Sequence, residues 1–282
     1  MLDKDWFSEP FGDEGLAFSL KVSKKLEEVQ TPYQKIEIYE TKTFGNLMVI
    51  DGCVMLTSRD NFIYHEMMSH PALSVHPKPQ KVLIIGGGDC GTMREVLKHN
   101  CVVEVHQVDI DEQVTRLSEK YFPELCESND DSRANLHFED GVKWVQEAND
   151  DEFDLVIIDS TDPIGPAEGL FTQDFFAECG RILKSDGIYV QQSESPLLHA
   201  DTIIKNMRTN LQNGGFNKIL TLNFPQCCYP SGWWSCTMAS KEIDLEQDVK
   251  SDLAIETKYY NGDVHRAAKA IPQFCLQHWQ EN

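Results

Sequence analysis

Long hydrophobic runs are missing from this sequence of 282 residues, and so is a basic start followed by an apolar stretch. The first absence argues against a membrane-spanning helix, which needs about 20 consecutive apolar residues. The second argues against a secretion signal, so the expected location is cytoplasmic. At about 100 to 200 residues per domain, the length suits one large domain and a small one.

Metal-binding and disulfide patterns are also missing. The nine cysteines are odd in number and irregularly spaced, and they include no C-x-x-C pair. This argues against a disulfide framework and against a thiolate zinc site. The nine histidines lack the H-E-x-x-H spacing of a catalytic metal centre. The sequence therefore predicts free thiols, no metal and no prosthetic group.

Positive charge is scarce, because 25 bases stand against 46 acids and the formal net charge is -21. Such a chain repels nucleic-acid phosphates and anionic lipids, so neither nucleic acid nor a membrane is an expected partner. The balance favours a cationic small-molecule ligand, although many of these charges will be solvated surface.

The stretch 81–98 contains the strongest local signal. An apolar run ends at Gly86, a glycine turn follows, and helical spacing begins after it. Gly86, Gly88 and Gly91 fit G-x-G-x-x-G, which allows a ligand to approach the backbone at a helix N-terminus. The next apolar run ends on Asp109, about 20 residues further on, where an acid would meet ribose hydroxyls. We interpret this stretch as a nucleoside-binding strand, turn and helix.

Apolar runs and helical patterns alternate from there to residue 211. Strands are predicted at 81–86, 102–108, 136–138, 153–159 and 187–192, and helices at 111–121, after Asp140-Gly141, at 172–183 and at 201–211. This alternation predicts an α/β, Rossmann-like, doubly wound and mainly parallel sheet. Ligands of such sheets bind beyond the C-terminal strand ends, where Asp89, Asp109, Asp140 and Asp159 lie.

Residues 15–56 have instead the short alternating pattern of an antiparallel sheet, with Asp51-Gly52 as a hairpin turn. A helix is predicted from Asn61 to Leu73, and Pro77 and Pro79 then interrupt the chain. We predict an N-terminal β-strand domain with its connecting helix at 1–77 and a catalytic domain at 78–282. Because so few strands bury little on their own, we expect the first domain to mediate a homodimer or homotetramer.

The chain resembles the polyamine aminopropyltransferases of the spermidine synthase type. The segments that carry this resemblance occur in the family's order: Tyr33-Gln34, 60–66, 86–89, 109–112, Asp140-Gly141, 159–168, 229–232 and 259–266. The resemblance implies transfer of an aminopropyl group from decarboxylated S-adenosylmethionine to putrescine. The products would be spermidine and methylthioadenosine.

The resemblance also implies roles for individual residues. Asp159 would be the base that deprotonates the attacking amine, Tyr64 would orient that amine, and Asp162 and Tyr229 would hold the acceptor. The residues expected to bind the donor are Gln34, His65 and Asp89 at the aminopropyl end, Asp109 at the ribose, Asp140 and Gly141 at the adenine, together with Gly86, Gly88 and Pro166. An alkylamine with a pKa of about 10 is protonated at neutral pH, so this chemistry needs a base. Pro163, Gly165 and Pro166 predict a loop that closes over the ligands.

Several alternatives stay open at this point. Tyr64 and Tyr229 could be packing aromatics, and His65 a surface histidine. A methyltransferase, an NAD-dependent dehydrogenase or a nucleoside-sensing module would also use the glycine turn and Asp109, although none of them explains the acidic loop at 159–162. The chain departs from the family pattern at Cys90, Met55 and Asp13, and the Trp233-Trp234 pair is unassigned.

Overall fold

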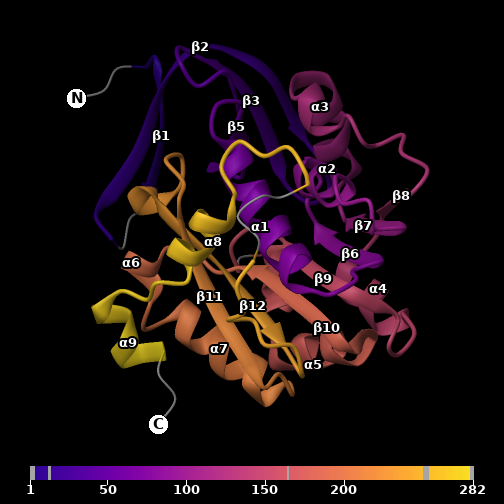
Figure 1. Cartoon of the computed structure of the whole chain (residues 1–282). Coiled ribbons are helices and arrows are strands. Elements are labelled where there is room, and N and C mark those ends of the chain that lie inside the picture. Colours follow the sequence, from indigo (N-terminus) through magenta and orange to yellow (C-terminus); the bar gives the residue numbers. More distant parts are fainter. Residues whose placement is uncertain (1–3, 12–13, 164, 250–253, 280–282) are drawn as a thin grey trace.

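The computed structural model describes residues 4–11, 14–163, 165–249 and 254–279. It contains two sheets, an antiparallel five-stranded one from the N-terminal part of the chain and a central seven-stranded one (Figure 1). The first comprises β1 (Trp6–Phe11), β2 (Leu16–Gln30), β3 (Lys35–Thr41), β4 (Asn46–Ile50) and β5 (Cys53–Thr57).

The central sheet has the order β11-β12-β10-β9-β6-β7-β8. Its strands are β6 (Lys81–Gly86), β7 (Glu104–Asp109), β8 (Ala134–Phe138), β9 (Phe153–Asp159), β10 (Leu183–Gln192), β11 (Lys218–Pro225) and β12 (Trp233–Ser240). The five strands from β10 to β8 are parallel, whereas β12 pairs antiparallel with both β10 and β11. The Rossmann-like prediction is confirmed, and the chain order reverses beside β6, where ligands of such sheets bind.

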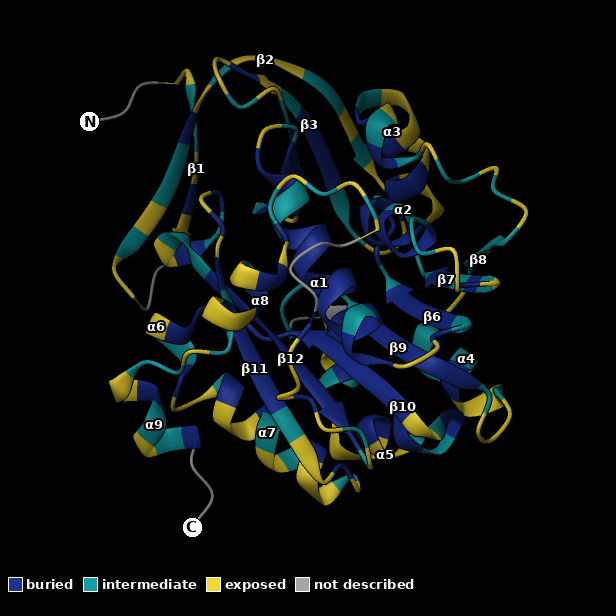
Figure 2. Ribbon diagram, in the orientation of Figure 1, coloured by how far each residue is buried: buried dark blue, intermediate teal, exposed yellow. Residues whose placement is uncertain are grey.

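Helices cover both faces of this sheet. They are α1 (Asn61–Val75), α2 (Gly91–Leu97), α3 (Glu112–Tyr121), α4 (Gly141–Glu147), α5 (Gln173–Ile182), α6 (Pro196–His199), α7 (Ile203–Asn213), α8 (Gly262–Ala268) and α9 (Gln273–Trp279), with short 3₁₀ turns η1 (Pro123–Leu125), η2 (Gly165–Phe171) and η3 (Pro230–Gly232). Alternate residues of each strand face opposite sides, so Val82 and Ile84 of β6 pack towards α1 and α2, and Leu83 and Ile85 pack towards α4 and α5. Both layers are buried, which explains the uninterrupted apolar runs (Figure 2).

The N-terminal sheet packs on α3. Ile36, Ile38 and Met48 share a buried cluster with Val114 and Leu117 of that helix. Helix α1, in contrast, contacts α2 and the central strands. The boundary at residues 77 and 78 stays a prediction.

Some elements were not expected from the sequence. β1 contains a proline and does not show clean alternation, and β2 extends through Lys24 and Lys25, eight residues beyond the apolar segment that predicted it. β11 and β12 complete the sheet, and the Trp233-Trp234 pair begins the second of them. Among the described residues, no helix is long and apolar enough to cross a bilayer.

Candidate functional site

The glycine turn after β6 packs against the end of the neighbouring strand β9. Gly86 ends β6 with a φ of 82°, and a Cβ there would lie 2.2 Å from the backbone oxygen of Asp159. The next residue, Gly87, donates its N–H to that same oxygen at 2.7 Å. Only glycine permits both the backbone conformation and the approach, so the G-G-G sequence positions β6 against the end of β9.

Asp159 is held by two hydroxyl groups. Tyr64 of α1 donates to Oδ1 at 2.6 Å, and Thr92 of α2 donates to Oδ2 at 2.6 Å. Burial, followed by the charge of Asp89, raises the pKa of the Asp159 carboxyl. A raised pKa makes this group a stronger base than an exposed aspartate, and the two donors fix its orientation.

Asp89 follows the glycine turn and pairs with His65, the residue after Tyr64 in α1. The Nε2 atom of His65 lies 3.2 Å from Oδ1 of Asp89, and Gly91 donates its N–H to that oxygen at 2.7 Å. Burial alone would raise the pKa of Asp89, but the charge and hydrogen bond of His65 bring it below its usual value. The alternative of a surface histidine is wrong, because His65 is 1% exposed.

Asp109 lies at the end of β7 beside the same turn. The backbone N–H of Asp111 donates to it at 2.8 Å, and burial raises its pKa to about 6. A Cβ on Gly88 would come within 2.7 Å of the Asp109 carboxylate. Gln34 reaches the site from the N-terminal sheet, where its Nε2 atom donates to Asp111 at 3.1 Å. Both sheets therefore contribute to one cavity.

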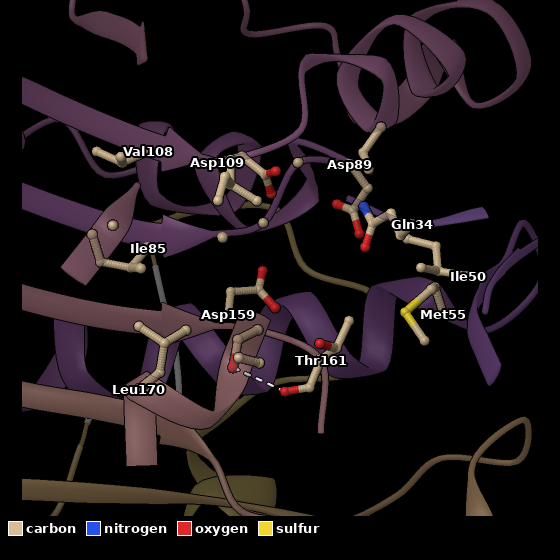
Figure 3. A pocket seen from close by; sticks show the side chains of 18 of the residues that line it. Gln34, Ile50, Met55, Ile85, Asp89, Val108, Asp109, Asp159, Thr161 and Leu170 are labelled. Carbon is tan, nitrogen blue, oxygen red and sulfur yellow. Dashed lines mark hydrogen bonds between the residues drawn. The ribbon is translucent and has the colours of Figure 1, made fainter. Parts of the chain in front are cut away.

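This cavity has an apolar and a polar end. Figure 3 shows Ile85, Val108 and Leu170 on one side, Asp89 and Gln34 on the other, and Asp159 between them. Asp140 and Gly141 also line it. The Asp140 carboxylate caps α4 by accepting the N–H groups of residues 142 and 143. Pro166 lies in η2, but its side chain is outside the part that the structure describes, as is Asp13.

A second, smaller cavity opens from the first. Five residues line both cavities: Met55, Tyr64, Ser160, Thr161 and Tyr229. Tyr229 donates its hydroxyl to the backbone oxygen of Met55 at 2.6 Å, and its ring packs against Tyr64 and Trp234. Trp234 lines the second cavity, whereas Trp233 packs against Phe274.

Three acids gather at the second cavity. Asp162 lines it, and burial, followed by the charge and hydrogen bond of Glu194, raises the pKa of Asp162 to about 8. Burial also raises the pKa of Glu194. Glu9 of β1 accepts the N–H of Val54 at 2.9 Å, and burial together with the charge of Asp162 raises its pKa to about 7. A buried carboxyl group with a raised pKa ionises more readily when a cation binds beside it. The three acids can therefore bind a cation.

Glu9 and Glu194 were not predicted. Glu194 lies two residues beyond the C-terminal end of β10, so the rule that found the other strand-end acids would have found it. Glu9 lies in β1, which the sequence pattern did not indicate.

The comparisons with known proteins agree with this geometry. The family model described as "Spermine/spermidine synthase domain" matches residues 61–250, and the "Spermidine synthase tetramerisation domain" matches residues 5–58. The polyamine aminopropyltransferase of Thioalkalivibrio sulfidiphilus is 61% identical, and that of Nitrosococcus oceani 58% identical, each over 97% of this chain and 97% or 96% of the relative. The chain belongs to the spermine/spermidine synthase family.

Solved structures give the same result for this aminopropyltransferase. A spermidine synthase in complex with the transition-state analogue AdoDATO has a TM-score of 0.93 at 35% identity, over 98% of this chain and 95% of that one. The spermidine synthase of Thermotoga maritima has a TM-score of 0.90 at 35% identity, over 97% and 93%. The chain is thus an enzyme that transfers aminopropyl groups in polyamine biosynthesis.

One further cluster of possible metal ligands lies at the opposite end of β9 in this aminopropyltransferase. Atoms of His76, Asp154 and Asp186 lie within 4.8 Å of one another. Asp154 already accepts the backbone N–H groups of Gln80 and Lys81 and the ammonium of Lys184. With these three donors on its two oxygens, Asp154 holds the strand ends together and is a poor metal ligand.

Proposed function

We propose that this enzyme is a spermidine synthase that transfers an aminopropyl group from decarboxylated S-adenosylmethionine to putrescine. The observation that carries this proposal is the position of Asp159, which lines the first cavity together with Asp89 and accepts the hydroxyl of Tyr64, a residue that lines both cavities. Asp162 lines the second cavity. The donor and the acceptor are both dications, so each needs an acidic side chain beside its distal ammonium. The reaction also needs a base where the attacking nitrogen of the acceptor meets the donor.

The donor's adenosine would occupy the apolar end of the first cavity. Asp109 would accept the ribose hydroxyls, and Asp140 with Gly141 would contact the adenine. The ammonium of the aminopropyl arm would meet Asp89, with His65 and Gln34 beside it. Gly86, Gly88 and Pro166 would complete the surface around the nucleoside.

The acceptor would extend into the second cavity. Its attacking nitrogen would lie at Asp159, with Tyr64 and Tyr229 against its alkyl chain. Its distal ammonium would lie among Glu9, Asp162 and Glu194, which ionise when the cation arrives. Asp159 would accept a proton from the attacking ammonium, and the neutral amine would displace methylthioadenosine from the sulfonium.

The donor preference separates this function from methyl transfer. Ordinary S-adenosylmethionine carries a carboxylate beside the ammonium, and that carboxylate would lie near Asp89 and Asp159. An unpaired carboxylate there would cost a few kcal/mol, which corresponds to roughly 100-fold weaker binding.

The test is to incubate the purified protein with putrescine and each sulfonium compound and to measure methylthioadenosine. We expect product from the decarboxylated donor alone. Asp89→Asn should weaken the decarboxylated donor more than methylthioadenosine, which has no ammonium to lose. Comparable affinity of the unmodified protein for both sulfonium compounds would favour a methyltransferase.

We also propose that the chain assembles as a homodimer or homotetramer through its N-terminal sheet. The match of residues 5–58 to a tetramerisation domain supports this, and β1 forms one edge of that sheet. A light-scattering mass equal to the 32.2 kDa of one chain would contradict it.

A further inference from the structure

Two cysteines lie against the backbone of the donor-binding turn. Cys90 precedes α2 with a φ of 70°, a backbone conformation that favours glycine, and its side chain is fully buried. Cys126 follows η1 and is half-buried against the cluster that contains Cys90. Both side chains pack in this one cluster, and the neighbouring Cys90 thiol contributes to the raised pKa of Cys126.

The same thiols also bond to consecutive carbonyl groups of the turn. Cys90 donates to the oxygen of Gly88 at 3.6 Å, and Cys126 donates to the oxygen of Asp89 at 3.7 Å. The two sulfurs therefore lie together on the segment whose carboxylate, in the proposed function, binds the donor's ammonium.

We propose that Cys90 and Cys126 form a modification site, in which a hydroperoxide converts the two thiols to a disulfide that weakens donor binding. All nine cysteines are free thiols in the structure, so the reduced pair is the starting state. The effect on the donor rests on the proposed function, whereas formation of the bond does not.

The reaction balances with one equivalent of peroxide. The half-buried Cys126 sulfur attacks the peroxide, breaks the O–O bond and becomes a sulfenic acid, with release of one water or alcohol. The Cys90 sulfur then displaces the hydroxyl group as water and forms the S–S bond. The hydrogen bond with Cys90, followed by burial, raises the pKa of Cys126, so its thiolate is scarce and oxidation is slow near neutral pH.

The disulfide would alter the turn directly. Both S–H donors are lost, so the carbonyl groups of Gly88 and Asp89 each lose a partner. The S–S bond also requires the two sulfurs to approach to about 2.05 Å, which pulls η1 towards the start of α2. Asp89 adjoins Cys90 in sequence, and its backbone oxygen contacts Cys126. Its carboxylate should therefore move relative to His65 when the disulfide forms.

The test treats the purified enzyme with hydrogen peroxide, blocks the remaining thiols and maps tryptic peptides. We expect a cross-link between the peptides 82–94 and 121–133 that dithiothreitol reverses. The KM for the decarboxylated donor should rise by about tenfold, the equivalent of about 1.4 kcal/mol, with kcat little changed. Cross-linking should be faster at pH 9 than at pH 7.

Cys126→Ser should keep normal basal activity and resist the peroxide effect, whereas the matched control Cys101→Ser, at an exposed thiol, should respond like the unmodified enzyme. Equal sensitivity of Cys126→Ser, no cross-linked peptide, or a cross-link that leaves the donor KM unchanged would each overturn the proposal. The peptide map needs no ligand, so a failure of the proposed reaction would leave this readout intact.

Discussion

At the scale of single residues, the proposed mechanism depends most on Asp159. Asp159→Asn keeps the size of the side chain and can still accept from Tyr64 or Thr92, but it cannot take up a proton. We expect turnover to fall by roughly 100-fold or more, while methylthioadenosine still binds. Rates from stopped assays and affinities from calorimetry would measure both effects, and near-normal turnover at neutral pH would remove Asp159 from the role of base.

The acids of the second cavity predict a dependence on pH. The pKa of Glu9 is raised to about 7 and that of Asp162 to about 8, so the folded protein holds protons that an unfolded chain releases near pH 4. Their contribution to stability is therefore complete below about pH 4 and is lost as pH rises through 7 and 8. Putrescine should offset this loss, because its distal ammonium pairs with the ionised cluster.

Thermal unfolding with and without putrescine between pH 6 and pH 9 checks this. The rise in Tm caused by putrescine should grow with pH, and Glu9→Gln should reduce that growth. A rise in Tm that is the same at every pH would show that the acceptor does not use this cluster.

At the scale of elements, helix α1 contributes residues to the site and also binds the backbone of the C-terminal segment. Tyr64 and His65 face Asp159 and Asp89, and the next residue, Glu66, accepts the backbone N–H groups of residues 258, 259 and 260 at 2.8 to 2.9 Å. The Tyr259-Tyr260 segment is thus structural, and one helix links it to the site.

Glu66→Ala leaves three backbone N–H donors without their acceptor, the buried one of Tyr260 and two that are part-buried. At about 1 to 3 kcal/mol for each unsatisfied group, with partial relief from water, we expect a loss of about 3 to 5 kcal/mol of stability. Denaturant unfolding measures this loss, and Glu242→Gln at an exposed position is the matched control. A loss below 1 kcal/mol would mean that the C-terminal segment does not depend on this carboxylate.

Prediction from the sequence succeeded where one element determines the position of a residue. Asp89, Asp109, Asp140 and Asp159 follow apolar strands, and parallel strands bring their ends to one edge of a sheet. It failed where a residue depends on distant pairing. Glu9 reaches the site because β1 pairs with the long β2, and neither the proline in β1 nor the lysines in β2 indicates a strand.

At the scale of the whole molecule, the acid excess has a function in the proposed reaction. In that reaction the donor and the acceptor would both be dications, so a formal net charge of -21 would raise the local concentration of both substrates. The same charge disfavours nucleic acid, and it provides a test that no single residue offers. Exposed charges are screened beyond about 10 Å at 0.1 M salt, whereas the buried acids of the two cavities are screened much less.

Raising sodium chloride from about 0.05 to 0.5 M should therefore weaken the binding of the decarboxylated donor and of putrescine by a few-fold each, because the Debye length falls by roughly threefold. Inhibition by methylthioadenosine, which is neutral, should change little and serves as the matched control on the same protein. Steady-state KM values and an inhibition constant at each salt concentration give the comparison. If the binding of all three ligands weakens equally, salt acts on the fold and not on the electrostatic field of the protein. The acid excess would then not attract the substrates. If only the binding of putrescine weakens, the electrostatic field of the protein acts at the second cavity. The donor would then be held by its short-range contact with Asp89 and not by that field.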